Sequence, residues 1–310
     1  TKLVALDAHE MRGRDVVALE QQVRNTWSEK PQVCEFLVRS FAQALHGRRK
    51  GDMCVPFPTV FGKGDRRDFQ AAESCLENLP FNGTRSEELP PLNEGQVLLL
   101  HWILFSHKNN AKRLKATTLS HLRECSPLLV EEIQQEGKNL CPDTILETQS
   151  NDTADRNSGA DLFPAFHGTH PENIHSIVRV GLLNLSNTHM QRTGRAFGEG
   201  IYLAQELSTA FSFTRSPAPS NWINKHEGMR CVFVCSVTNA ESPISQIDVP
   251  KNYVVVRECD RVIIRYIFIY RECRRSSKRI DFCALLVLFY LATLLCPVFL
   301  EQIRWHGNLK

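Results

Sequence analysis

Apolar residues recur every three or four positions through the first hundred residues, the pattern of helices with one buried face. This spacing predicts helices over residues 15–27, 32–47, 66–79 and 93–108. The stripe of the second helix consists of Val33, Phe36, Leu37, Phe41 and Leu45, and Gly47 follows it as a stop signal. The turn-rich residues 56–65 interrupt the series. We therefore expect a small all-helical domain over residues 1–110.

After residue 162 the apolar runs become rich in β-branched and aromatic residues, bounded by Gly, Pro and Asn. They predict buried strands over residues 200–204, 229–240, 252–258 and 261–272. A helix precedes them, because Thr169 and Glu172 have the spacing of a capping box and Gly181 suits a helix end. The polar residues 142–161 predict a loop. We expect an α+β domain over residues 111–280.

Residues 282–300 form a run of nineteen residues without a charge. As a helix the run spans roughly 28 Å at about 1.5 Å per residue, close to the ~30 Å of a bilayer core. A buried core helix is the alternative, but such a helix usually keeps a polar face. Only ten residues, 301–310, follow it. The run therefore predicts a C-terminal transmembrane helix of the tail-anchor type.

Basic residues are denser before this segment than after it, and cytoplasmic flanks carry such an excess. The N-terminal bulk is thus expected in the cytosol and residues 301–310 in the lumen. Glycosylation sequons begin at Asn82, Asn151 and Asn184. All three are then expected to stay unmodified, because they never enter the lumen.

Charge and cysteine content narrow the class of protein. The net charge of +3 is small, and no basic patch interleaved with aromatic residues is present, so we expect no nucleic-acid partner. The eleven cysteines are scattered and contain no CxxC pair, which favours a reducing compartment over a disulfide scaffold. Cys231 and Cys235 are spaced to share one face of a strand, where buried free thiols are expected.

Three histidines, His167, His170 and His175, lie within nine residues. Their spacing matches no zinc pattern and the chain has no HExxH, so we expect no metal site. His170 and His175 are expected at the surface or at a helix edge. His167 differs because it ends an apolar strand and is followed by Gly168, which lets a ligand approach the backbone closely. This pair is a candidate site for a small polar ligand.

A second candidate segment has the sequence FGEGIYL, residues 197–203. Gly198 and Gly200 predict a turn, and Tyr202 opens the strand that follows. The segment lacks the third glycine and the helix of a dinucleotide fingerprint. The pattern alone leaves open whether Tyr202 belongs to the core or to a binding site.

The order of these motifs resembles the catalytic domain of the poly(ADP-ribose) polymerase family. The shared set is a strand, His167-Gly168-Thr169, a helix ending at Gly181, the segment 197–203, and a late strand that begins near Tyr253. The helical domain and the C-terminal anchor resemble one subgroup, the tail-anchored mono-ADP-ribosyltransferase of the endoplasmic reticulum. The resemblance covers roughly residues 30–300. It implies an ADP-ribosyltransferase-type split β-sheet preceded by a small all-helical domain.

The resemblance implies that NAD is the substrate and that no metal is needed. The bond between nicotinamide and ribose breaks, and ADP-ribose passes to a protein side chain. His167 is then expected to bond the adenosine ribose, and Gly168 to bind the nicotinamide amide through its backbone. Thr169 adds a hydroxyl. Tyr202 and Phe213 are expected to stack on the nicotinamide ring.

The chain departs from the family pattern at three positions. Phe213 stands where the family often has a tyrosine, which keeps the ring and loses the hydroxyl. Ala210 stands where the family has a serine that bonds the nicotinamide amide. Tyr253 occupies the position that is glutamate in chain-forming members, and a phenol is a poor base at neutral pH. The catalytic set His167, Tyr202 and Tyr253 therefore implies transfer of a single ADP-ribose unit.

The expected partners are protein acceptors, including the chain itself, and the membrane through residues 282–300. The expected location is the membrane of the endoplasmic reticulum or the nuclear envelope. The alternative is a catalytically inactive module at the same membrane that binds NAD, ADP-ribose or a protein partner. Ala210 leaves room for this alternative, and the retained His167, Gly168 and Tyr202 favour the enzyme.

Overall fold

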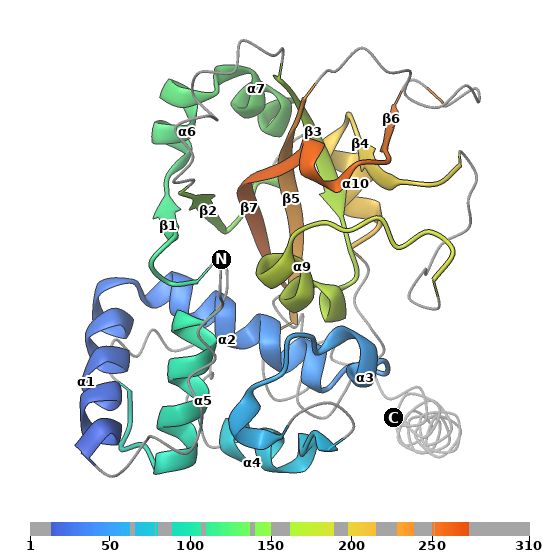
Figure 1. Cartoon of the computed structure of the whole chain (residues 1–310). Helices are drawn as coiled ribbons and strands as arrows, with labels where there is room; N and C mark the ends of the chain where they lie inside the picture. Colours follow the sequence, from blue (N-terminus) through green and yellow to red (C-terminus); the bar gives the residue numbers. More distant parts are fainter. Residues whose placement is uncertain are drawn as a thin grey trace, which may run out of the picture. The chain divides into compact units, whose positions relative to one another are not determined.

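The chain folds into a helical N-terminal part followed by a sheet, as the change in hydrophobic period predicts (Figure 1). The computed structural model divides the chain between Glu272 and Cys273, and the second of the two units lies outside the described residues. It describes residues 14–62, 66–77, 79, 89–106, 110–136, 140–149, 162–188, 198–214, 228–238, 250 and 252–272. Within these ranges no helix has the length and apolarity needed to cross a bilayer. The expected membrane segment at 282–300 lies outside the described residues.

The N-terminal part contains the helices that the apolar spacing predicts. They are α1 (Arg14–Glu29), α2 (Pro31–Leu45), α4 (Phe69–Glu77) and α5 (Glu94–Phe105), with the short α3 (Lys50–Met53) and the 3-10 turn η1 (Thr59–Phe61) between α2 and α4. The predicted stripe of α2 is buried along its whole length. The other faces of α2 are buried too, since it packs against α1 and α5 as well as against β1 and α9. Helix α2 is therefore the central element that joins the helical part to the sheet.

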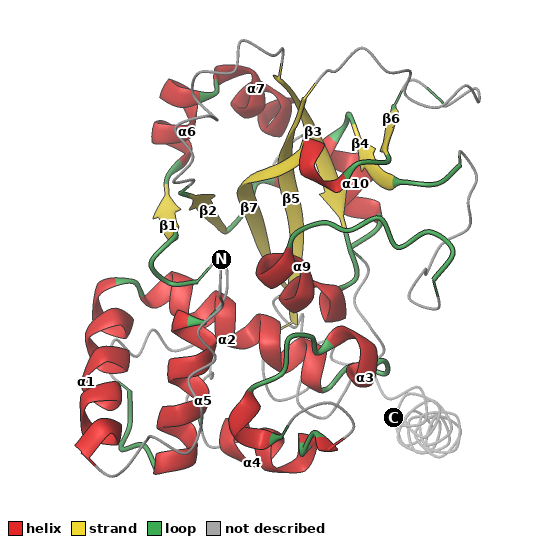
Figure 2. Ribbon diagram, viewed as in Figure 1, coloured by secondary structure: helices red, strands yellow, loops and turns green. Residues whose placement is uncertain are grey.

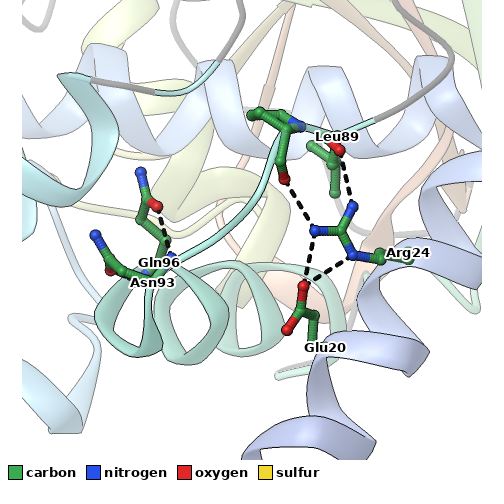
Figure 3. Close-up of polar contacts among 6 residues, drawn as sticks. Glu20, Arg24, Leu89, Asn93 and Gln96 are labelled. Carbon is green, nitrogen blue, oxygen red and sulfur yellow. Dashed lines mark hydrogen bonds and ion pairs between the residues drawn. The ribbon is translucent and has the colours of Figure 1, made fainter.

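Two sets of hydrogen bonds fix the start of α5 (Figure 3). The Asn93 side chain accepts a hydrogen bond from the Gln96 backbone N–H, and the Gln96 side chain accepts one from the Asn93 backbone N–H. Arg24 of α1 pairs with Glu20 one turn earlier and donates to the backbone carbonyl of Leu89. The segment before α5 is thus tied to α1, which holds the two helices side by side.

The described strands form one antiparallel sheet in the order β1-β2-β7-β5-β3-β4-β6 (Figure 2). They are β1 (Leu114–Thr117), β2 (Thr144–Thr148), β3 (Leu162–Gly168), β4 (Ile201–Ala204), β5 (Gly228–Thr238), β6 (Tyr253–Val256) and β7 (Val262–Glu272). The four predicted strand regions are confirmed as β4, β5, β6 and β7. Among these strands, β3 and β4 pair only through Phe166 and Ala204, so the β4–β6 ribbon diverges from the rest of the sheet there.

The two faces of the sheet bury different clusters. The alternation along β5 places Cys231, Phe233 and Cys235 in the cluster that includes α2 and α5. Val232 and Val234 belong to the opposite cluster, which includes α6 (Leu119–Cys125) and α7 (Pro127–Gln135). The predicted common face of the two cysteines is confirmed. Burial raises the pKa of both thiols well above the ordinary range, so they are inert core residues.

Two expectations about local structure are wrong, and three elements were not predicted. Part of the predicted loop 142–161 is strand β2, because Ile145 and Leu146 are buried and β2 pairs with β7. Thr169 and Glu172 form no capping box, because a 3-10 turn, η4 (Pro171–Asn173), precedes α9 (Ile174–Val180). Helices α6 and α7 and strand β1 are additions that the apolar pattern does not predict.

Candidate functional site

All six predicted ligand-binding residues line one cavity of about 970 Å³. They are His167, Gly168, Thr169, Tyr202, Phe213 and Tyr253. They come from β3 and the residue after it, from β4 and β6, and from the residue that follows α10 (Leu207–Ser212), and they are up to 86 residues apart in the sequence. Ala210 lines the same cavity. The volume of the cavity is within the range of sites that bind small molecules.

His167 is held with one ring nitrogen on the backbone of the neighbouring strand. Its Nδ1 lies 2.9 Å from the carbonyl oxygen of Tyr202. Because a carbonyl oxygen only accepts, Nδ1 carries the proton, and Nε2 of the neutral ring is an acceptor. Burial lowers the pKa of His167 below its ordinary 6.5, although the hydrogen bond to Tyr202 opposes this. The ring is therefore neutral at pH 7 and offers an acceptor to a ligand hydroxyl.

The two predicted tyrosines share one face of the β4–β6 ribbon. Tyr253 lies directly opposite Ala204, and Tyr202 is two residues from Ala204 along β4. The Tyr202 hydroxyl donates to the carbonyl oxygen of Gly198, 2.6 Å away, which fixes the ring against the turn before β4. The register therefore explains how a residue at 202 and one at 253 reach the same cavity.

Gly168 also has a packing role that its sequence context does not predict. A Cβ at this position would lie 1.6 Å from the carbonyl oxygen of Ala210, so the missing side chain makes room for α10. This close packing places the end of α10, and with it Phe213, at the cavity. The Phe213 side chain is 46% exposed there. Thr169 is buried and accepts a hydrogen bond from the Asn173 side-chain amide.

The rim of the cavity is unusually apolar. Six large apolar side chains in the described ranges are strongly exposed, and four of them line this cavity. The four are Val55, Val180, Leu183 and Phe213. Exposed apolar groups concentrated around one cavity indicate a surface that is covered when a ligand binds.

One wall was missed from the sequence, because it comes from the helical part. It consists of Arg49, Asp52, Met53 and Val55, in and around α3. The Arg49 Nε atom lies 3.7 Å from Oε1 of the buried Glu172 in η4, which joins this wall to the sheet domain. The only sequence signal for it is the basic run Arg48-Arg49-Lys50 at the start of α3, which is equally typical of a solvated turn.

Of the other two histidines, His175 is not at the surface or at a helix edge as expected, whereas His170 directly precedes η4. His175 is 1% exposed; its Nε2 bonds the Pro56 carbonyl oxygen at 2.9 Å, and its ring packs edge-on against Phe41. His170 is 15% exposed, lines the cavity and lies 3.7 Å from Glu172. The burial of His175 was missed because Phe41 and Pro56, which contact its ring, come from the helical part. Among the described residues no group of three metal-ligating side chains is present.

Comparisons with known proteins cover both parts of the chain. Residues 111–256 match the family model of the poly(ADP-ribose) polymerase catalytic domain, and residues 25–104 match that of the ARTD15 N-terminal domain. Protein mono-ADP-ribosyltransferase PARP16 of Mus musculus is 25% identical over 307 residues, which cover 86% of this chain and 90% of the mouse protein. The human protein of that name is 25% identical over 329 residues, covering 94% of this chain and 93% of its own length.

A more distant relative matches through a smaller share of its length. Protein mono-ADP-ribosyltransferase PARP8 of Homo sapiens is 24% identical over 303 residues, which is 81% of this chain and 33% of the human protein. Together these matches confirm the resemblance stated from the sequence and support an NAD+ ADP-ribosyltransferase of the mono type. The chain therefore carries a catalytic domain of the poly(ADP-ribose) polymerase type, preceded by a domain of the ARTD15 N-terminal type.

Proposed function

We propose that this chain is an NAD-dependent protein mono-ADP-ribosyltransferase that modifies itself and other proteins from the cytosolic side of a membrane. The observation that carries the enzymatic proposal is the convergence of all six predicted ligand-binding residues on one cavity. Six residues that served only to pack the core would not be expected to line one cavity from several different elements.

The geometry suggests how NAD is oriented for the reaction. Nε2 of neutral His167 accepts a hydrogen bond from a hydroxyl of the adenosine ribose. The Tyr202 ring, fixed through its hydroxyl, and the exposed ring of Phe213 stack on nicotinamide. The backbone of Gly168 binds the nicotinamide amide. Ala210 offers no hydroxyl to this amide, so one amide contact of the family is absent.

The reaction breaks the bond between the ribose C1′ and nicotinamide. Nicotinamide leaves as a neutral molecule with the electron pair of that bond, and a nucleophilic atom of the acceptor side chain forms a new bond to C1′. The acceptor proton is lost to solvent. The residues of the cavity act by orientation and by exclusion of water. Tyr253 supplies no carboxylate to activate a second ribose hydroxyl, so the product carries one unit.

The membrane part of the proposal rests on residues 282–300 alone. Their uncharged length fits a single bilayer crossing, and we place the protein in the endoplasmic reticulum or nuclear envelope. A sequon added after Lys310 is expected to be glycosylated in microsomes, while Asn82, Asn151 and Asn184 stay unmodified. Glycans on these three residues would overturn the proposed orientation.

The enzymatic proposal is tested by the products formed from labelled NAD. The full chain in detergent is expected to give a discrete labelled band on a denaturing gel, and His167→Ala is expected to give none. A high-molecular-weight smear would show that Tyr253 does not limit transfer to one unit. Absence of label together with measurable NAD binding would favour the inactive binding module, for which the loss of the amide contact at Ala210 is the supporting observation.

A further inference from the structure

The wall that the helical part contributes to the cavity carries a cation. Arg49 is the only lysine or arginine among the described residues that line the cavity. NAD and ADP-ribose both carry a diphosphate with two negative charges. Arginine is the side chain best suited to such a group, because its planar fork donates two parallel hydrogen bonds.

We propose that Arg49 binds the diphosphate of NAD, so that the helical domain completes the substrate site. This inference rests on the proposed NAD-dependent function and adds a binding residue to it. Asp52 also lines the cavity, and Glu172 lies 3.7 Å from Arg49 Nε, so the proposed contact is a direct hydrogen bond and not a long-range attraction.

Two contacts of Arg49 are of kinds that a diphosphate can replace. Its Nε lies at the long distance of 3.7 Å from Glu172, and an Nη donor meets Met53 Sδ, a weak acceptor, at 3.0 Å. Glu172 also lies 3.7 Å from His170 Nδ1. If Arg49 turns to a diphosphate, Glu172 still has the His170 ring as a polar neighbour.

Helix α3 is placed to hold this residue at the cavity. It packs against η4, which continues from the strand that ends with His167 and Gly168. Arg49 immediately precedes α3, whereas the side chain of the next residue, Lys50, pairs with Glu73 and does not line the cavity. Arg49 and Lys50 are thus adjacent cations with different surroundings. Lys50→Gln is therefore a matched control for Arg49→Gln.

The test is calorimetric binding of ADP-ribose and of nicotinamide to the full chain in detergent. Arg49→Gln is expected to weaken ADP-ribose binding on the order of tenfold or more, the loss of a charge-assisted contact, with nicotinamide binding unchanged. Lys50→Gln is expected to leave both unchanged. Glu172→Gln removes the competing carboxylate and is expected to leave ADP-ribose binding equal or tighter.

Unchanged ADP-ribose binding by Arg49→Gln would overturn the proposal. Equal weakening by Arg49→Gln and Glu172→Gln would also overturn it, because the ion pair would then act only as a structural link. If Arg49→Gln does not fold, Arg49→Lys keeps the charge but not the fork, and an intermediate loss of ADP-ribose affinity is expected. If the wild-type chain binds no ADP-ribose, the proposed function fails first, which separates the two outcomes.

Discussion

The cavity has two walls, and different kinds of contact hold the residues of each wall in place. The sheet wall is set by strand register: His167 bonds the backbone at Tyr202, and Tyr253 faces the same side through Ala204. The helical wall is set by packing between distant segments, since Arg49 meets the sheet domain through Glu172, 123 residues later. The first wall carries the residues predicted to bind NAD, and the second adds Arg49, Asp52, Met53 and Val55 to the lining of the cavity.

The largest effect is expected from a comparison of one glycine in each region. Gly168→Ala would place a Cβ 1.6 Å from the Ala210 carbonyl, so α10 must move. A loss of about 3 kcal/mol or more in the free energy of unfolding is expected, with loss of NAD binding. A Cβ added to Gly51 in α3 would meet no heavy atom within 4 Å beyond its own turn of helix. Gly51→Ala is therefore expected to be neutral or stabilising by up to about 1 kcal/mol.

Denaturant unfolding of both variants measures this difference. If Gly168→Ala were as stable as the wild type, the close packing of β3 on α10 would be refuted. If Gly51→Ala were strongly destabilising, α3 would be more tightly enclosed than its surroundings indicate.

The sheet wall could be predicted from the sequence and the helical wall could not. Motifs around His167 and Tyr202 are local, and each lies in an apolar strand run that the sequence makes visible. The contact of Arg49 with Glu172 leaves no local pattern, and the burial of His175 depends on Phe41 and Pro56 from the helical part. Strand β2 was missed because the polar residues that follow it dominate the window.

The second prediction concerns how the helical part is attached. Arg179 of α9 is 2% exposed, and it donates hydrogen bonds to the carbonyl oxygens of Ile103 and Ser106 at the end of α5. Arg179→Met keeps the apolar stem but leaves those carbonyls without these donors. A loss of about 2 kcal/mol in unfolding free energy is expected. Urea denaturation measures it, with Arg123→Met on the exposed side of α6 expected within about 0.5 kcal/mol of wild type.

The unfolding of Arg179→Met also shows how strongly the helical part is attached to the sheet. If Arg179→Met separates unfolding into two transitions, the helical part and the sheet are held together largely by this contact. Wild-type stability in Arg179→Met would contradict the role assigned to the buried guanidinium.

The smallest expected effect compares one histidine in each region. Burial lowers the pKa of His167 in the sheet wall, and burial with the charge of Lys112 lowers the pKa of His101 in α5. The unfolded chain then binds more protons than the folded chain just below pH 6.5, so stability falls as pH decreases from 6.5 toward the lowered values. Each unit of lowering corresponds to about 1.4 kcal/mol.

Thermal unfolding of the full chain between pH 5 and 8 measures these contributions as differences from the wild type. His167→Gln and His101→Gln are each expected to flatten the loss of stability below pH 6.5, because each removes one group that must be buried neutral. The two effects should add, since one ring lies on β3 and the other on α5. An undiminished pH dependence in His167→Gln would mean that its ring is protonated in the folded chain. Nε2 would then be a donor, and the acceptor role assigned to it on the sheet wall would have to be withdrawn.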